Sequence, residues 1–298
     1  MPSPRTAALI VRAPAKVNLR LNVVAKRADG YHELDSLMFP ISLYDTLRIR
    51  VVASPRATVR CVVTGPERVE GGSDNLAARA ALGVLGCLGE TAQVSIGLHK
   101  VIPSGAGLGG GSSDAAAVIR CLPRLLGRRL RPEEAFVLAR SLGADVPFFL
   151  DCRPARATGI GDLLTAIDAV PRGALLVAVP PDRVNTAWAY RSALPRLTSA
   201  RTASRFRAFP RHIDAVESWF SNDFQPGVEA AVGSVKRARE ALESGGARAT
   251  VLSGSGSAVV GLFESASAAR LAAKRYDGPG QVHLAKILRR PPAAQSES

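Results

Sequence analysis

The sequence predicts an α+β fold in two parts. Segments with strand periodicity and segments with helical periodicity follow one another without the strict alternation of strand, helix and strand that builds a parallel sheet. The chain has 298 residues, which is enough for two ordinary domains. We expect a first domain at residues 1–168 and a second at residues 169–298.

The individual elements follow from local patterns. Alternating or β-branched residues predict strands at 10–23, 47–53, 58–63, 94–102, 174–179 and 258–263. Helical periodicity predicts helices at 75–88, 112–121 and 132–142, within 227–244, and at 266–276. The first segment is expected to form one or two strands around Pro14, and Asp29-Gly30 predicts a turn. Pro123 should end or kink the second helix near Cys121, because proline lacks a backbone N–H.

Composition excludes several classes of protein. A hydrophobic content of 47% with 21% charged residues is typical of a soluble globular protein. No apolar stretch reaches the roughly 18–20 residues of a membrane span, and the apolar patch at 7–11 is too short for a signal peptide, so we expect a cytoplasmic protein. The four cysteines form no Cys-x-x-Cys pair and have no histidine at metal-ligand spacing, which argues against a zinc enzyme and predicts free thiols.

The net charge of +14 fits either an anionic partner or a basic surface that is merely solvated. A positive field attracts small polyphosphates, but a nucleic-acid-binding protein would also be basic. The arginines concentrate in two stretches, 120–140 and 183–211, and only 5% of the residues are aromatic, so no nucleic-acid-binding module is visible. The charge fits an enzyme with anionic substrates but does not decide for one.

Residues 104–114, SGAGLGGGSSD, carry five glycines among seven residues between a predicted strand and a predicted helix. Glycines leave backbone N–H groups free to converge on an anion, and the helix N-terminus adds its positive dipole end. The segment therefore predicts a phosphate-binding loop. It fails as a Rossmann fingerprint because no strand ending in an acidic residue follows, and as a Walker loop because Gly111 stands where the lysine belongs. A charge-neutralising lysine and a catalytic carboxylate must come from elsewhere.

Lys16 and Asp145 are the best candidates for these two roles. Both stand in apolar surroundings, APAKVNL and LGADVPFF, where a charged side chain needs a partner or a function. Alone, Lys16 is equally well explained as an outward-facing strand residue, and Asp145 as a turn residue that caps its own backbone. Pairing of the two would explain both. A second glycine-serine run at 252–257 is either a tight turn or a lid over a phosphate or substrate.

Together these segments resemble the family of galactokinase, homoserine kinase, mevalonate kinase and phosphomevalonate kinase. Residues 103–115 (PSGAGLGGGSSDA) are similar to its central ATP loop, and residues 251–263 to its C-terminal glycine motif. The resemblance implies an ATP-dependent small-molecule kinase of two domains. The first would resemble domain 2 of ribosomal protein S5, the second would be an α/β sandwich, and the active site would lie in the cleft between them.

Three further segments narrow the resemblance. Residues 13–21 (APAKVNLRL), 27–34 (RADGYHEL) and 142–149 (LGADVPFF) are similar to those of family members that phosphorylate a diphosphocytidyl sugar alcohol. This implies transfer of the γ-phosphate of ATP to the 2-hydroxyl of 4-diphosphocytidyl-2-C-methyl-D-erythritol, in the non-mevalonate (methylerythritol phosphate) route to isoprenoid precursors.

The resemblance also assigns residues. The implied catalytic pair is Lys16 and Asp145. The implied ATP-binding residues are Asn75, Lys100, Pro103, Ser104, Gly105, Ala106, Gly107, Leu108, Gly109, Gly110, Gly111, Ser112 and Ser113. The implied substrate-binding residues are Asn18, Tyr31, His32, Tyr190, Gly254, Ser255 and Gly256. In this arrangement two tyrosines lie on the faces of the cytosine ring and the histidine hydrogen-bonds its edge. Mg²⁺ is expected with ATP, but its ligands stay open, since helix capping explains Ser112 and Asp114 equally well.

Three alternatives remain open from the sequence. The first is another kinase of the same family, such as a mevalonate or homoserine kinase, and only the segment around Tyr31 and His32 separates it. The second is a nicotinamide-dependent oxidoreductase on a Rossmann fold, and the third is a non-catalytic nucleic-acid-binding protein. The kinase interpretation expects ATP and a small-molecule substrate as partners, without nucleic acid, membrane or an obligate protein partner.

Overall fold

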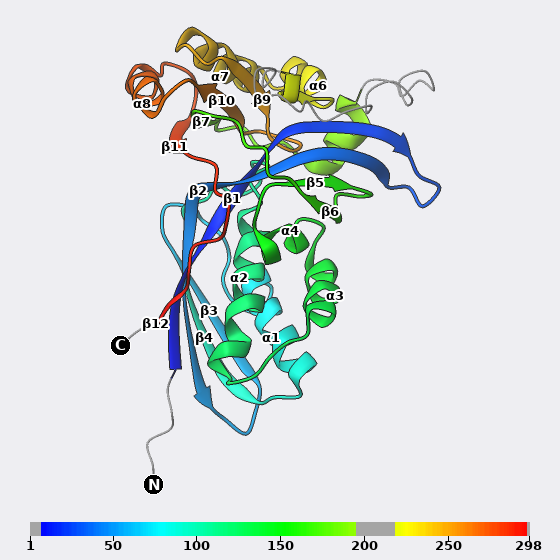
Figure 1. Ribbon diagram of the computed structural model, residues 1–298, viewed down its shortest axis with the longest axis vertical. Helices are drawn as coiled ribbons and strands as arrows, with labels where there is room; N and C mark the ends of the chain where they lie inside the picture. The colour runs from blue at the N-terminus through cyan, green and yellow to red at the C-terminus, as the bar shows by residue number, and fades with distance from the viewer. Residues whose placement is uncertain (1–6, 195–217, 297–298) are drawn as a thin grey trace.

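Two β-sheets form the framework of the protein (Figure 1). The computed structural model describes residues 7–194 and 218–296. The larger sheet contains β1 (Ala7–Lys26), β2 (His32–Ala53), β3 (Thr58–Thr64), β4 (Ala92–His99), β5 (Ala155–Thr158), β6 (Leu163–Ala166), β8 (Ser221–Asn222) and β12 (Gln295–Ser296). Its order is β12-β1-β2-β4-β3, while β5 pairs with β2 and β6, and β8 pairs with β1.

Helices cover one side of this sheet (Figure 1). They are α1 (Leu76–Leu88), α2 (Gly110–Leu125), α3 (Pro132–Leu142) and α4 (Val146–Asp151). Alanines on the inner faces of α1 and α2 allow the two helices to approach the strands closely, and these alanines are buried. This packing places the N-terminus of α2, and therefore the glycine loop before it, at the end of the helical layer.

The smaller sheet has the order β11-β7-β10-β9. Its strands are β7 (Ala174–Val179), β9 (Ala249–Leu252), β10 (Val259–Phe263) and β11 (Gln281–Ala285). Its helices are α6 (Gln225–Ala231), α7 (Gly233–Ser244) and α8 (Ala266–Arg275), with the short α5 (Thr186–Trp188) and the π-helical turn η1 (Ala189–Ala193) following β7. None of the described helices of either part is long and apolar enough to cross a membrane.

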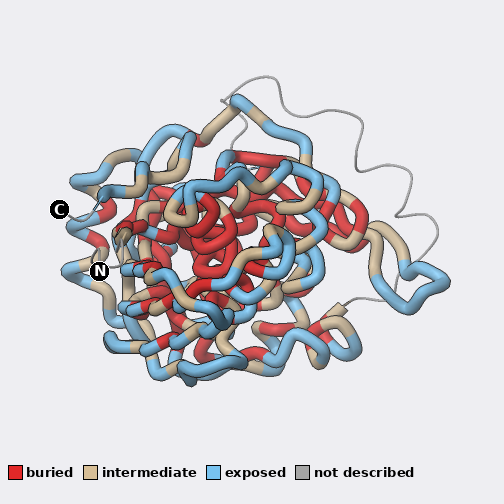
Figure 2. Tube along the Cα trace, turned by 90° about the horizontal axis from the view of Figure 1, so that it is seen from below, coloured by how far each residue is buried: buried red, intermediate tan, exposed pale blue. Residues whose placement is uncertain are grey.

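The β1–β2 hairpin joins the two parts because its middle is buried on both faces. Residues such as Val11 belong to the core under α1 and α2. Val17 belongs to a second core, which it shares with Val177 of β7. A register shift between Pro14 and Ala15 accompanies this change of face. Figure 2 shows the buried residues gathered in the centre of the molecule.

Several element boundaries differ from those predicted. β1 runs unbroken through Pro14, and the strand predicted at 47–53 is only the end of β2, which begins at His32. α2 does not end near Cys121 but continues to Leu125. Pro123 lies in the last turn, where its missing N–H removes a single helical hydrogen bond.

The division that we predict at residue 168 falls between β6 and β7, where the chain leaves the larger sheet. Two later strands, β8 and β12, nevertheless pair with β1.

Candidate active site

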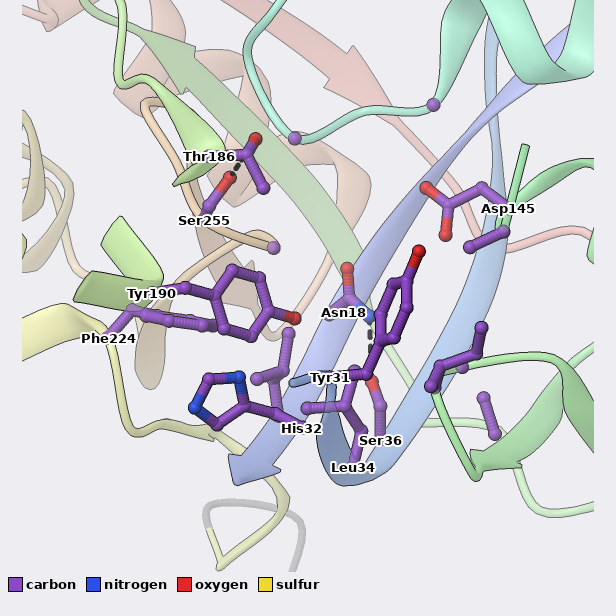
Figure 3. Close-up of a pocket in the computed structure, with 18 of the residues that line it drawn as sticks. Asn18, Tyr31, His32, Leu34, Ser36, Asp145, Thr186, Tyr190, Phe224 and Ser255 are labelled. Atoms are coloured by element: carbon purple, nitrogen blue, oxygen red, sulfur yellow. Dashed lines mark hydrogen bonds between the residues drawn. The ribbon is translucent and has the colours of Figure 1, made fainter. Parts of the chain in front are cut away.

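A cavity of about 1330 Å³ lies where the β1–β2 hairpin, the glycine loop and the segment around α5 meet. The predicted site residues that line it are Lys16, Asn18, Tyr31, His32, Gly105, Gly107, Gly109, Ser112, Asp145, Tyr190, Gly254 and Ser255. The fold thus brings the predicted catalytic pair, part of the predicted phosphate loop and the predicted base-binding side chains into one space. Figure 3 shows eighteen of the residues that line this cavity, Asp145 and Tyr190 among them.

The glycine loop reaches the cavity through left-handed backbone. The φ angles are +66° at Gly105, +78° at Gly107 and +69° at Gly109. A Cβ at Gly107 would lie 2.1 Å from the carbonyl oxygen of Ser253, and one at Gly109 would lie 3.0 Å from the side chain of Lys16. Glycine is required at both positions for backbone conformation and for space. α2 begins directly after the loop and has no side-chain N-cap, so its first N–H groups are available to an anion.

The second glycine-serine run packs directly on this loop. Ser253 Oγ donates to the carbonyl of Gly107 (3.0 Å) and accepts from the N–H of Asn18 (3.2 Å). The N–H of Ala258 donates to the carbonyl of Ala106 (3.1 Å). The run is therefore a turn held against the loop, and its residues Gly254 and Ser255 face the cavity.

Lys16 enters the cavity from β1. Its backbone N–H donates to the carbonyl of Leu108 (2.9 Å), which fixes the strand to the loop. Its Nζ lies 2.5 Å from Asn18 Oδ1 and 3.5 Å from Asp145 Oδ2. The Asn18 amide is oriented by its Nδ2, which donates to Ser36 Oγ (2.7 Å). The pairing of Lys16 with Asp145 that we predict is present in the structure.

Asp145 does not stabilise the start of α4 through its side chain. It occupies the N-cap position of α4, but its side chain makes no capping hydrogen bond. The carboxylate is 38% exposed, whereas the Lys16 side chain is only 5% exposed. A buried ammonium and a partly exposed carboxylate therefore face the same space. The explanation of Asp145 as a residue that caps its own backbone is wrong.

Aromatic side chains gather at the other end of the cavity (Figure 3). The rings of His32 and Tyr190 have centroids 5.0 Å apart, and those of Tyr190 and Phe224 lie 4.8 Å apart, edge to face. Tyr31, at the tip of the hairpin, is 61% exposed, and its ring lies on the Asp145 side of the cavity in Figure 3. The rings of His32, Tyr190 and Phe224 form a site suited to a flat base.

Two pKa shifts define the charge of this aromatic end. Burial, and then the charge of Lys26, lowers the pKa of His32, so its imidazole is neutral at pH 7. Burial, and then the charge of Asp145, raises the pKa of Tyr190 to about 12. Both side chains are therefore neutral hydrogen-bonding groups, which suits an uncharged base.

Sequence reasoning missed several lining residues. They are Lys26, Leu34, Ser36, Thr186, Arg191 and Phe224, among others. Thr186 Oγ1 lies 2.9 Å from Ser255 Oγ and extends the polar wall of the cavity. Lys26 and Arg191 add two cations beside the aromatic end. Of these residues only Arg191 had a signal in the sequence, because it lies in the arginine-rich stretch 183–211.

The remaining predicted residues are not among those that line this cavity. Pro103, Ser104, Ala106, Leu108, Gly110, Gly111, Ser113 and Gly256 belong to the two glycine segments but are not among the lining residues. Asn75 caps α1, because its Oδ1 accepts the N–H of Ala77 (3.0 Å) and its Nδ2 donates to the carbonyl of Glu70 (3.0 Å). Both ends of its amide are thus occupied by the protein.

The predicted contact of Lys100 with ATP stays a prediction, and its side chain is held within the protein. The residue is 2% exposed and its ammonium contacts two buried carboxylates, those of Asp45 and Asp114. Its side chain is therefore occupied by partners inside the protein and is not among the cavity-lining groups.

Asp114 is likewise removed from the candidate Mg²⁺ ligands by its bond to Lys100. The described residues contain no group of three or more His, Cys, Asp or Glu side chains arranged to hold a metal ion. Mg²⁺ bound with a nucleotide needs only one or two protein oxygens beside the phosphates. Ser112, which lines the cavity beside the loop, could supply one such oxygen.

Comparison with known proteins agrees with this geometry. The profile of the GHMP kinases N-terminal domain matches residues 75–152, and that of the GHMP kinases C-terminal domain matches residues 209–279. A 4-diphosphocytidyl-2-C-methyl-D-erythritol kinase of Geobacter sp. (strain M21) is 42% identical over 89% of this chain and 93% of that protein. The chain belongs to the 4-diphosphocytidyl-2-C-methyl-D-erythritol kinase family.

Other members of this kinase family and the solved structures support the assignment. The kinase of the same name from Anaeromyxobacter sp. (strain K) is 42% identical over 95% of this chain and 92% of that protein. A crystal structure of 4-(cytidine 5'-diphospho)-2C-methyl-D-erythritol kinase aligns with a TM-score of 0.76 at 35% identity, over 93% of this chain and 98% of that one. The homoserine kinase of Cytophaga hutchinsonii has a TM-score of 0.74 at 17% identity, which shows a shared fold alone.

These findings confirm the predicted fold class, a two-domain GHMP kinase of α+β type, and the prediction of an ATP-dependent small-molecule kinase. The Rossmann oxidoreductase and the nucleic-acid-binding protein are not favoured. The roles of the individual site residues remain predictions.

Proposed function

We propose that the chain transfers the γ-phosphate of ATP to the 2-hydroxyl of 4-diphosphocytidyl-2-C-methyl-D-erythritol, for isoprenoid precursor biosynthesis. The observation that carries this proposal is the arrangement of the cavity. The Lys16–Asp145 pair lies between an anion-binding glycine loop and an aromatic site for a base. An acceptor with a cytosine at one end and a hydroxyl at the other would span that distance.

Each end of the cavity has its own task. The phosphates of ATP bind the N–H groups of the glycine loop and of the first turn of α2. Tyr31 and Tyr190 contact the faces of the cytosine, and neutral His32 hydrogen-bonds its edge. Lys26 and Arg191 lie close enough to this end to favour an acceptor that carries a diphosphate.

Transfer takes place at the catalytic pair. Asp145 orients the acceptor hydroxyl and takes its proton, and Lys16 stabilises the charge that spreads over the transferred phosphoryl group. Asn18 holds the ammonium in place through its Oδ1. Phosphoryl transfer through a loose transition state depends mainly on positioning and on charge stabilisation, and this pair supplies both.

We propose Mg²⁺ as the metal that accompanies ATP, and the Ser112 hydroxyl beside the glycine loop would be one of its ligands. When bound, it would neutralise charge on the β- and γ-phosphate oxygens. A cytoplasmic location and independence from an obligate protein partner remain predictions.

The test is ADP release in a coupled assay with four acceptors. We expect turnover with 4-diphosphocytidyl-2-C-methyl-D-erythritol and none with mevalonate, homoserine or galactose. Turnover with one of the other three acceptors would support the proposed ATP site and contradict the proposed cytosine site. Absence of ADP release with all four, from folded protein that binds ATP, would contradict the proposal.

A further inference from the structure

One buried ammonium is shared by three segments of the chain next to the glycine loop. Lys100 follows β4, Asp45 lies in β2 and Asp114 lies in α2. The three residues are 2%, 0% and 1% exposed, respectively. Lys100 Nζ contacts both carboxylates and lies 2.8 Å from Asp114 Oδ2. We call Lys100, Asp45 and Asp114 the Lys100 cluster.

The cluster fixes the beginning of the loop through Asp45. Its Oδ2 contacts Lys100, and its Oδ1 accepts the N–H groups of Val101 (2.6 Å) and Ile102 (2.8 Å). These two residues come directly before Pro103, where the loop starts. One carboxylate therefore holds both the ammonium and the last backbone amides before the loop.

The cluster also fixes the end of the loop. Asp114 lies in the first turns of α2, and its Oδ2 accepts from Lys100. The ammonium lies so close to the start of this helix that a Cβ at Gly110 would be 2.9 Å from Lys100 Nζ. Both ends of the loop at 103–109 are thus attached to the same charged group.

We propose that the Lys100 cluster is a positioning device that holds the glycine loop in its ATP-binding form before ATP arrives. The proposal rests on the function proposed above only in naming ATP as the ligand. Glycines lose more conformational freedom on ordering than any other residue. If ATP had to order a loop with this many glycines, the entropy cost of ordering would weaken ATP binding. Fixing both ends of the loop before ATP binds therefore raises the affinity for ATP.

The composition of the cluster argues for such a role. A single ammonium between two carboxylates leaves an excess of buried negative charge, and burial raises the pKa of Asp114 against the opposing effect of Lys100. Asp114 Oδ1 has no hydrogen-bond partner within the described protein. A buried ionic cluster of this kind adds little net stability compared with apolar side chains of the same size. What it does supply is a fixed geometry at both ends of the loop.

The experiment compares Asp45→Asn and Asp114→Asn with the matched control Glu229→Gln. Glu229 forms a partly buried ion pair with Arg239 (2.8 Å) in the second half of the chain, away from the cavity. Hydrogen exchange of the loop amides is measured without ligand, and binding of a non-hydrolysable ATP analogue is measured by calorimetry. KM is measured for ATP and for the acceptor.

We expect Asp45→Asn to speed exchange of the loop amides and to weaken analogue binding by about tenfold, the effect of lost preorganisation. The acceptor KM should stay within about twofold of the wild type, and Glu229→Gln should change none of these quantities. Asp114→Asn should act in the same direction but less, because it removes the excess charge of the cluster.

A folded Asp45→Asn protein with wild-type loop exchange and analogue affinity would overturn the proposal. Equal weakening of ATP and acceptor would also overturn it, since that result indicates general loosening. If Asp45→Asn does not fold, Asp114→Asn decides by the same two measurements. Neither exchange nor analogue binding depends on the acceptor, so failure of the proposed phosphoryl transfer is distinguishable from failure of this inference.

Discussion

Asp145→Asn should separate catalysis from stability. The carboxylate is 38% exposed, lies 3.5 Å from Lys16 Nζ and caps no helix. Half-exposed ion pairs contribute about 0–1 kcal/mol to the free energy of unfolding. Lys16 also keeps its second partner, Asn18 Oδ1, at 2.5 Å. The melting temperature should therefore fall by no more than about 2–4 °C.

The kinetic loss should be much larger. Asparagine retains the size of the side chain but cannot take the proton of the acceptor hydroxyl. A positioned acid–base group contributes about 10²–10⁴ in rate, which corresponds to about 2.7–5.4 kcal/mol of activation free energy. Affinity for ATP depends mainly on the glycine loop, so it should change far less than kcat.

The assay is coupled ADP release at saturating concentrations of both substrates, together with thermal unfolding and ATP-analogue binding. Asp151→Asn is the matched control, because Asp151 ends the same helix, is 62% exposed and pairs with Arg153. It should leave kcat unchanged. A kcat for Asp145→Asn within tenfold of the wild type, or equal losses of kcat and ATP affinity, would refute the assignment of Asp145.

Four other predictions follow from the geometry. Gly107→Ala should lower the free energy of unfolding by about 2 kcal/mol or more and weaken ATP binding, because its Cβ would lie 2.1 Å from Ser253. Gly86→Ala, in open space within α1, should instead raise the free energy of unfolding by about 0.5–1 kcal/mol. Thermal unfolding of the two variants makes the comparison. Because burial lowers the pKa of His32, its protonation should have its midpoint below the ordinary histidine value, and the acceptor KM should rise with it. His32→Gln should abolish that pH dependence. Tyr190→Ala should raise the acceptor KM about tenfold because stacking on the base is lost, whereas Tyr190→Phe should change this KM little. Similar effects of the two substitutions would contradict a stacking role. Ser253→Ala should lower the free energy of unfolding in urea by about 1–3 kcal/mol and raise the KM for both ATP and the acceptor. The reason is that it removes a buried hydroxyl that hydrogen-bonds both the glycine loop and β1. A change in only one of the two KM values would argue against a connection between loop and strand through this hydroxyl.

Contiguous patterns in the sequence predicted the elements that carry the chemistry. The glycine spacing, the preceding strand and the following helix are neighbours in the chain, so local rules located the loop at 103–113. The first part of β2 was missed for a physical reason. Residues 34–41 are buried on both faces, which removes the alternation that marks a strand, and Pro40 lowers the strand signal further.

Residues that depend on long-range packing were beyond the reach of these patterns. Phe224 reaches the cavity because α6 packs beside η1, and Ser36 does so through the register of β1 with β2. The family resemblance places Lys100 among the ATP-binding residues. Its burial depends on Asp45, which lies 55 residues earlier, and no local pattern reveals that contact.

The orientation of the loop follows from the hydrogen bonds of its carbonyls. Three successive carbonyls, those of Ala106, Gly107 and Leu108, accept from Ala258, Ser253 and Lys16. In a trans peptide the next N–H points opposite to the carbonyl, so the amides of residues 107–109 are turned away from these three donors. The donors come from β1 and from the turn before β10, so both halves of the chain set the direction of the phosphate-binding amides. The ATP site is therefore a product of the whole fold, although the sequence motif that marks it is local.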